Sequence, residues 1–99
     1  MFLTLSNSGL IPLMLSAAAA ASSPLRILAS PWSPPAWLKV PMDDGNQTML
    51  GSASPNGLID DDKTKTTWAN YISAWVSSYE KHGVKISFLT PQNEAEVVI

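Results

Sequence analysis

Hydrophobic residues recur at helical spacing in two stretches of the chain. In the first, about residues 6–22, the apolar positions three or four residues apart are Leu10, Leu13, Met14, Ala17 and Ala21. In the second, about residues 66–81, they are Trp68, Tyr71, Ile72, Trp75, Val76 and Tyr79. Polar residues such as Asn70 and Ser73 occupy the other face of the second stretch. The pattern predicts two helices.

A short, mostly apolar run follows each predicted helix. These runs cover residues 25–30 and 84–90, and they end at Pro31 and Pro91. Short apolar runs between chain breakers are typical of buried parallel strands. The order helix, strand, loop, helix, strand predicts an α/β fold over residues 1–99, with the carboxyl ends of both strands at one edge of a parallel sheet.

Residues 1–23 also fit a second interpretation. The apolar run from Leu10 to Leu15, followed by alanines, resembles the apolar region and cleavage site of a signal peptide, although no Lys or Arg precedes it. Ser6 to Ser8 can cap a helix, and Pro24 would end it. We favour the helix over the signal peptide. The run is too short for a membrane span.

The segment from Val40 to Asp62 has the composition of a long loop. It is rich in Gly, Asn, Asp, Ser and Pro without periodicity. Its tripeptide Asn46-Gln47-Thr48 is a glycosylation sequon, which matters only if the chain is secreted. Asp60 to Asp62 are expected to form an acidic helix start rather than a metal site. His82, just before Gly83, is expected to cap the second helix rather than to act as a base.

The composition excludes several classes of function. Lys and Arg total six and are scattered, so no basic stripe is available for nucleic acid. The chain has no cysteine and a single histidine, so it cannot form disulfides, thiolate metal sites or a zinc centre of its own. Hydrophobic residues make up 45% of the chain and charged residues 14%, which is typical of a globular protein.

The candidate chemistry lies in the two segments that follow the predicted strands. Parallel α/β proteins bind ligands beyond the carboxyl ends of their strands. There the sequence places Trp32 and Trp37 after the first strand, and Asn93 and Glu94 after the second. A Glu near aromatic surface can have a raised pKa and donate a proton near neutral pH. Glu96 is the weaker candidate for this role because it lies further along.

The two motifs resemble those of glycoside hydrolase family 30, the glucosylceramidase group. The first motif runs from Leu28 to Lys39 and contains Ser-Pro-Trp-Ser-Pro-Pro-Ala-Trp. The second is Leu-Thr-Pro-Gln-Asn-Glu, residues 89–94. They occur in the same order as in the family, with a matching loop, helix and strand between them. The resemblance covers most of the chain, from near Leu10 almost to its end.

The resemblance implies a fragment of a TIM (β/α)8 barrel, containing its third and fourth strands and the helix before each. It implies that Glu94 is the general acid/base and that Asn93 binds the 2-hydroxyl of the sugar. Trp32 matches a tryptophan that lines the glycone site. Trp37 belongs to the same motif, and it would either contact the substrate or pack beneath the tryptophan that lines the glycone site. No cofactor or metal is implied, because two carboxylates suffice for this chemistry.

Two departures from the family limit what the chain is expected to do. Ala95 stands where the family has Pro after the acid/base. No residue matches the second carboxylate, which a retaining glycosidase needs roughly 5 Å from the first. We therefore expect the isolated chain to be inactive and to require the remainder of the barrel.

The expected function is that of a retaining glycosidase that hydrolyses glucosylceramide to glucose and ceramide. The substrate would be a glycolipid, at a membrane surface, or a β-glucan. The expected compartment is extracellular, or the lumen of lysosomes or endomembranes. The alternative is a non-catalytic truncated product, or a small secreted protein that contacts carbohydrate without turnover.

Overall fold

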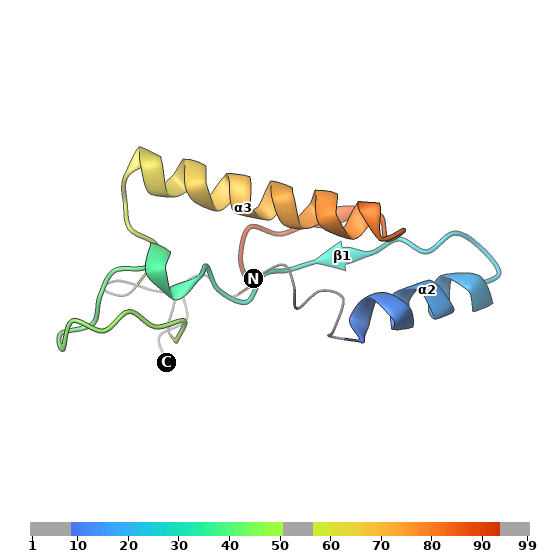
Figure 1. Cartoon of the computed structure of the whole chain (residues 1–99), viewed down its shortest axis with the longest axis horizontal. Coiled ribbons are helices and arrows are strands. Elements are labelled where there is room, and N and C mark those ends of the chain that lie inside the picture. Colours follow the sequence, from blue (N-terminus) through green and yellow to red (C-terminus); the bar gives the residue numbers. More distant parts are fainter. Residues whose placement is uncertain (1–8, 51–56, 94–99) are drawn as a thin grey trace. The chain divides into compact units, whose positions relative to one another are not determined.

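The computed structural model describes residues 9–50 and 57–93, and Figure 1 shows them in the order helix, strand, helix, strand. They divide into two compact units. The first unit contains residues 9–29 and 72–89, and the second contains residues 30–50, 57–71 and 90–93. The boundary falls within the long helix α3 (Asp62–Lys81), so each unit includes part of that helix.

The first unit contains a pair of parallel strands. These are β1 (Leu28–Ala29) and β2 (Phe88–Leu89), with Leu28 opposite Phe88 and Ala29 opposite Leu89. The N–H groups of Ser87 and Phe88 both donate to the carbonyl of Ile27, at 2.9 and 3.1 Å. The strands are shorter than the ranges 25–30 and 84–90 expected from the sequence. Within the described residues each pairs only with the other, so few backbone groups take part in the ladder.

Within the described residues, the apolar side chains of the strand pair are largely exposed. Ile27 and Ile86 pack against the hydrophobic core. Leu28, Phe88 and Leu89 are 63%, 52% and 43% exposed. Successive strand residues point to opposite faces, so Leu28 lies on the face away from Ile27. Core packing is thus seen at Ile27 and Ile86, beside the paired residues, whereas the paired residues themselves are exposed or partly buried.

The core of the first unit joins its helices to the strand segments. Its buried residues are Ile11, Tyr79 and Val84, and the partly buried residues packed against them are Met14, Ile27, Trp75 and Ile86. Ile11 belongs to α2 (Leu10–Ala20), which lies within the expected range of about 6–22; residues 1–8 lie outside the described part. No helix in the described part of the chain is long and apolar enough to cross a membrane.

Helix α3 ends in a glycine-dependent turn. Gly83 has φ 89°, a left-handed conformation that side chains disfavour. Its N–H donates to the carbonyl of Glu80, and the N–H of Val84 donates to that of Tyr79, each at 3.0 Å. These two bonds, with buried Tyr79 and Val84 in one cluster, define a Schellman motif. The Nδ1 atom of His82 lies 2.7 Å from the carbonyl oxygen of Ser78, which confirms the predicted capping role.

Candidate functional site

The segment that follows β1 presents one tryptophan outward from a buried base. Trp32 is 67% exposed, whereas the next two residues, Ser33 and Pro34, are buried. The hydroxyl of Ser33 donates to the carbonyl of Pro34 at 2.7 Å, so its buried polar group has a partner. Prolines fix their own φ and restrict the residue before them. Trp32 is thus held on a stiff, anchored segment.

The second tryptophan lies on a short 3₁₀ helix, η1 (Ala36–Leu38). The N–H of Leu38 donates to the carbonyl of Pro35 at 2.9 Å, and the N–H of Lys39 donates to that of Ala36 at 3.0 Å. Leu38 is buried and anchors the turn, whereas Trp37 is 54% exposed. Within the described residues, neither indole stacks on another aromatic ring. Both faces of each tryptophan are therefore free of aromatic neighbours there.

The segments that follow the two strands are hydrogen-bonded to each other. The N–H of Asn93 donates to the carbonyl of Pro31 at 2.7 Å. The hydroxyls of Ser30 and Thr90 lie 2.6 Å apart, also within hydrogen-bonding distance. The structure thus brings the backbone of Asn93 to the residue that precedes Trp32, and Asn93 is partly buried. Glu94, the predicted acid/base, lies outside the described residues.

Gln92 has a buried amide beside this junction. Its Nε2 atom is buried and has no hydrogen-bond acceptor within the described part of the chain. A buried donor without a partner costs about 1–3 kcal/mol. An acceptor that lies outside the described residues would remove that cost. Gln92 was not among the residues singled out from the sequence.

Lys39 is fully buried, at 0% exposure, directly after η1. Its Nζ atom donates to the carbonyl of Leu50 at 3.3 Å, and burial lowers its pKa below the ordinary value. Its own carbonyl accepts a hydrogen bond from Nε2 of Gln47 at 2.8 Å. Backbone bonds from Val40 to Gly57 and from Ile59 to Leu38, at 2.8 and 3.0 Å, complete the contact. Lys39 therefore holds the long loop onto η1.

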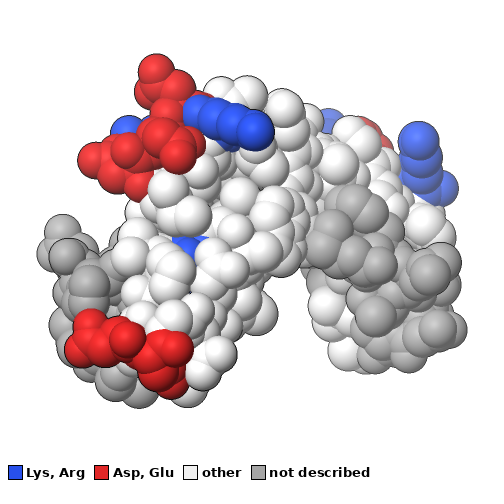
Figure 2. All heavy atoms as spheres, turned by 60° about the vertical axis from the view of Figure 1, so that its left-hand side comes forward, with Lys and Arg blue, Asp and Glu red and all other residues white. Residues whose placement is uncertain are grey.

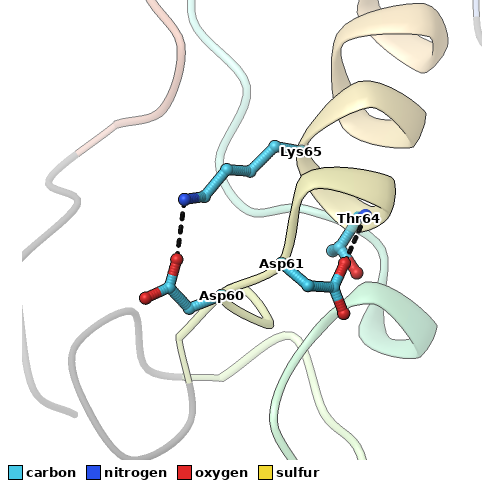
Figure 3. A network of polar contacts seen from close by, with 4 residues as sticks. All are labelled: Asp60, Asp61, Thr64 and Lys65. Carbon is cyan, nitrogen blue, oxygen red and sulfur yellow. Dashed lines mark hydrogen bonds and ion pairs between the residues drawn. The ribbon is translucent and has the colours of Figure 1, made fainter.

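The start of α3 is capped by a carboxylate. The Oδ1 atom of Asp61 accepts the N–H of Thr64 at 2.6 Å (Figure 3), an N-cap bond. Hydrogen bonds from the side chain and the backbone of Thr64 lower the pKa of Asp61. Asp60 and Lys65 form an exposed ion pair of 2.6 Å. The predicted acidic helix start is confirmed, but it begins at Asp62 rather than near Thr66, because polar capping residues carry no apolar periodicity.

The acidic residues of the second unit do not gather into a metal site. Figure 2 shows acidic side chains beside basic ones where α3 begins, and a separate acidic group on the loop. These groups correspond to Asp60–Asp62 and to Asp43 with Asp44. No group of three or more metal-binding side chains occurs within residues 9–50 and 57–93.

Sequence reasoning missed three residues that shape this region: Ser33, Lys39 and Gln92. The signal for Lys39 was its place in the otherwise apolar run Ala36-Trp37-Leu38-Lys39-Val40. A lysine in such a run is either exposed or buried with a partner. Ser33 carried no comparable signal, because a serine among prolines is common in exposed loops. Gln92 was visible only as the neighbour of Asn93.

Comparison with known proteins gives the family. Residues 6–98 match the glycosyl hydrolase family 30 TIM-barrel domain. The chain is 36% identical over 84 residues to lysosomal acid glucosylceramidase of Mus musculus, covering 85% of this chain. It is 34% identical over 86 residues, again 85% of this chain, to putative glucosylceramidase 4 of Caenorhabditis elegans.

A fungal relative carries a different name. The chain is 33% identical over 79 residues, 74% of its length, to an endo-1,6-beta-D-glucanase of Trichoderma harzianum. The match spans 15% of the length of each of these three relatives. The extent of the family match and these identities lead to one conclusion: the chain belongs to glycosyl hydrolase family 30.

Proposed function

We propose that this chain is part of the (β/α)8 barrel of a retaining β-glycosidase, with β1 and β2 as its third and fourth strands. The observation that carries the proposal is the hydrogen bond from Asn93 N–H to the carbonyl of Pro31, at 2.7 Å. It joins the motif that contains Trp32 to the motif that ends in Asn93 and Glu94. Ligand sites of parallel barrels are built from such segments, which follow the strands.

In this proposal Glu94 is the general acid/base. It donates its proton to the glycosidic oxygen while a carboxylate from a later strand attacks the anomeric carbon and the bond to that oxygen breaks. Glu94 then takes a proton from the water that attacks the covalent intermediate. Asn93 binds the 2-hydroxyl of the sugar. Trp32 provides the apolar platform for the sugar ring, and Trp37 provides a second contact or the packing below it.

The remainder of the barrel is the partner that this chain requires. Leu28, Phe88 and Leu89 of the strand pair are all at least 43% exposed, and apolar strand edges of this kind are stable only when paired or covered. The second carboxylate must also come from outside this chain. We therefore expect the isolated chain to show no turnover.

The proposed reaction is the hydrolysis of glucosylceramide to glucose and ceramide. The mouse relative, which is 36% identical, is named as a lysosomal acid glucosylceramidase. The fungal relative, named as an endo-1,6-beta-D-glucanase, supports a β-glucan as the second substrate. For the glycolipid, the enzyme would act at a membrane surface in the lumen of lysosomes or endomembranes, or outside the cell.

A chimeric enzyme tests the proposal. In it, this chain replaces the matching segment of the mouse glucosylceramidase, which supplies the other strands and helices of the barrel. We expect the chimera to hydrolyse glucosylceramide faster than β-1,6-glucan, whereas the isolated chain hydrolyses neither. A chimera that folds, as judged by circular dichroism, but cleaves neither substrate would contradict the proposal. The unmodified mouse enzyme is the control.

A non-catalytic carbohydrate-contacting role is the second candidate. The exposure of Trp32 and Trp37, 67% and 54%, favours it, because exposed indoles can stack on sugar rings without a catalytic pair. Calorimetric titration of the full chain with glucan oligosaccharides tests this role. Binding that is lost in Trp32→Ala would support it, and absence of any binding would exclude it.

A further inference from the structure

The sequon Asn46-Gln47-Thr48 lies directly after a tight turn in the second unit. The N–H of Gly45 donates to the carbonyl of Met42, and the N–H of Met42 donates to the carbonyl of Asn46, each at 2.8 Å. Gly45 has φ 84°, so the turn depends on a residue that tolerates the left-handed region. These bonds fix the backbone at the position where Asn46 leaves the turn.

The side chain of Asn46 is accessible at this position. Asn46 is exposed, as are the five residues before it. Its side-chain Nδ2 atom donates to Oδ2 of Asp44 at 3.0 Å, and its backbone N–H donates to Oδ1 of Asp44 at 2.9 Å. These two bonds lower the pKa of Asp44. Within the described residues, the amide nitrogen hydrogen-bonds to an exposed carboxylate, so a group attached to Nδ2 can extend into solvent from an exposed residue.

The next residue of the sequon points toward the body of the unit. The Nε2 atom of Gln47 donates to the carbonyl of Lys39 at 2.8 Å and lies 3.4 Å from that of Trp37. Gln47, itself an exposed residue, thus ties the loop to the η1 segment one position after Asn46. Thr48 is partly buried, and its hydroxyl accepts the N–H of Leu50 at 3.1 Å. The side chain of Gln47 attaches the loop to the η1 segment, whereas the hydrogen bonds of Asn46 within the described residues stay inside the turn, at Met42 and Asp44.

We propose that Asn46 is an N-glycosylation site. The donor would be an oligosaccharide linked through a pyrophosphate to a lipid. Nδ2 of Asn46 attacks C1 of the first sugar, the C1–O bond to the pyrophosphate breaks, and the lipid pyrophosphate leaves with the electron pair. Nδ2 releases one proton to the transferase. This proposal does not depend on the proposed hydrolysis, because it requires only passage through a secretory compartment.

Any N-linked glycan on this chain can be assigned to Asn46, because the sequence has one sequon. The other asparagines, Asn7, Asn56, Asn70 and Asn93, are not followed by Ser or Thr at the second position after them. The full chain is directed into the secretory pathway of animal cells by an added cleavable leader, and the secreted product is analysed by mass spectrometry. We expect a glycan mass that peptide-N-glycosidase removes under native conditions, converting Asn46 to Asp.

Four variants distinguish the effect of the sequon on glycosylation from the effect of the hydrogen bonds that hold the loop. Asn46→Gln and Thr48→Val should both lose the glycan mass. Gln47→Ala should retain it, although the bonds to the carbonyls of Trp37 and Lys39 are gone, whereas Gln47→Pro should lose it. A secreted wild-type chain without glycan would overturn the proposal, and so would a glycan that persists in Asn46→Gln.

Discussion

The two units of the chain differ in the kind of interaction that stabilises each of them internally. The first unit is built on an apolar cluster centred on Ile11, Tyr79 and Val84. In the second, the described loop segments are joined by hydrogen bonds, such as those from Asn93 to Pro31 and from Val40 to Gly57. Apolar packing resists single changes of polar groups, whereas a hydrogen-bonded loop depends on individual donors and acceptors. The first unit should therefore be destabilised mainly by changes to its apolar core. The second unit, which contains the described part of the candidate site, should be sensitive to the loss of single hydrogen bonds.

Helix α3 shows the same contrast at its two ends. Its C-terminal turn combines backbone bonds with the burial of Tyr79 and Val84. Its N-terminal turn depends on the exposed carboxylate of Asp61 and its bond to Thr64. The end in the second unit should therefore respond to pH through the carboxylate of Asp61.

The largest expected effect is on the apolar cluster. Tyr79→Ala in the mouse chimera should lower the free energy of unfolding by about 3–5 kcal/mol, because Tyr79 is 2% exposed and its removal leaves a cavity. Urea unfolding measures the change. The control Ser77→Ala, on the exposed face of the same helix, should change stability by less than about 0.5 kcal/mol. Equal effects of the two substitutions would contradict the assigned core.

Two of the glycines with positive φ, one in each unit, allow a direct comparison of the units. Gly83→Ala and Gly45→Ala should each cost about 1–2 kcal/mol in unfolding free energy, since both have φ above 80°. A Cβ at Gly83 would also lie 3.3 Å from Cδ2 of Leu15, whereas one at Gly45 would meet nothing within 4 Å. Gly83→Ala should therefore cost more. A larger loss for Gly45→Ala, measured by urea unfolding of the chimera, would argue against this packing.

The tryptophans of the second unit should affect catalysis rather than stability. Trp32→Ala in the chimera should lower kcat/KM for glucosylceramide about tenfold, equivalent to the loss of ~1.4 kcal/mol of ring contact. Because Trp32 is 67% exposed, urea unfolding should be almost unchanged. Trp37→Ala should have a smaller effect on kcat/KM. A larger effect for Trp37→Ala would reverse the two assignments.

The smallest expected effect is the pH response of the α3 start. The pKa of Asp61 is lowered from 3.8 in the folded chain, so the stabilisation by this cap is present above that value and is lost as the pH falls below it. The protection factor of the Thr64 amide, its exchange rate corrected for the intrinsic effect of pH, should fall at low pH. Asp61→Asn should retain a cap without the pH response, and Asp61→Ala should lose both. A protection factor at Thr64 that stays unchanged at low pH in the wild type would refute the assignment.

The sequence predicted the parts of the fold that depend on apolar spacing. The stripe from Trp68 to Tyr79 and the glycine at position 83 located α3 and its end, because burial and positive φ restrict residue type. The start at Asp62 was missed, since capping residues look like loop residues. The strands are shorter than their apolar runs, because strand length depends on pairing, and within the described residues each strand pairs only with the other.

The candidate site was predictable only in part. The strand-end position and the two motifs pointed to Trp32, Trp37, Asn93 and Glu94. The hydrogen bond between Asn93 and Pro31 joins residues more than sixty positions apart, and nothing local in the sequence indicates it. The burial of Lys39 was only half indicated, because a lysine in an apolar run is either exposed or buried with a partner, and the sequence does not show which. Polar contacts between residues far apart in the sequence produce no periodic pattern from which they could be predicted.

The most direct test of the proposed role of Glu94 is the substitution Glu94→Gln in the chimera. We expect kcat/KM for glucosylceramide to fall about 10²- to 10⁴-fold, the range of general acid–base catalysis. An aryl glucoside with a good leaving group needs no protonation in the first step, so added azide should restore its turnover and yield the β-glucosyl azide. Glu96→Gln, the matched control, should retain activity on both substrates. Full activity of Glu94→Gln on glucosylceramide, or loss on the aryl glucoside without azide rescue, would contradict the assignment.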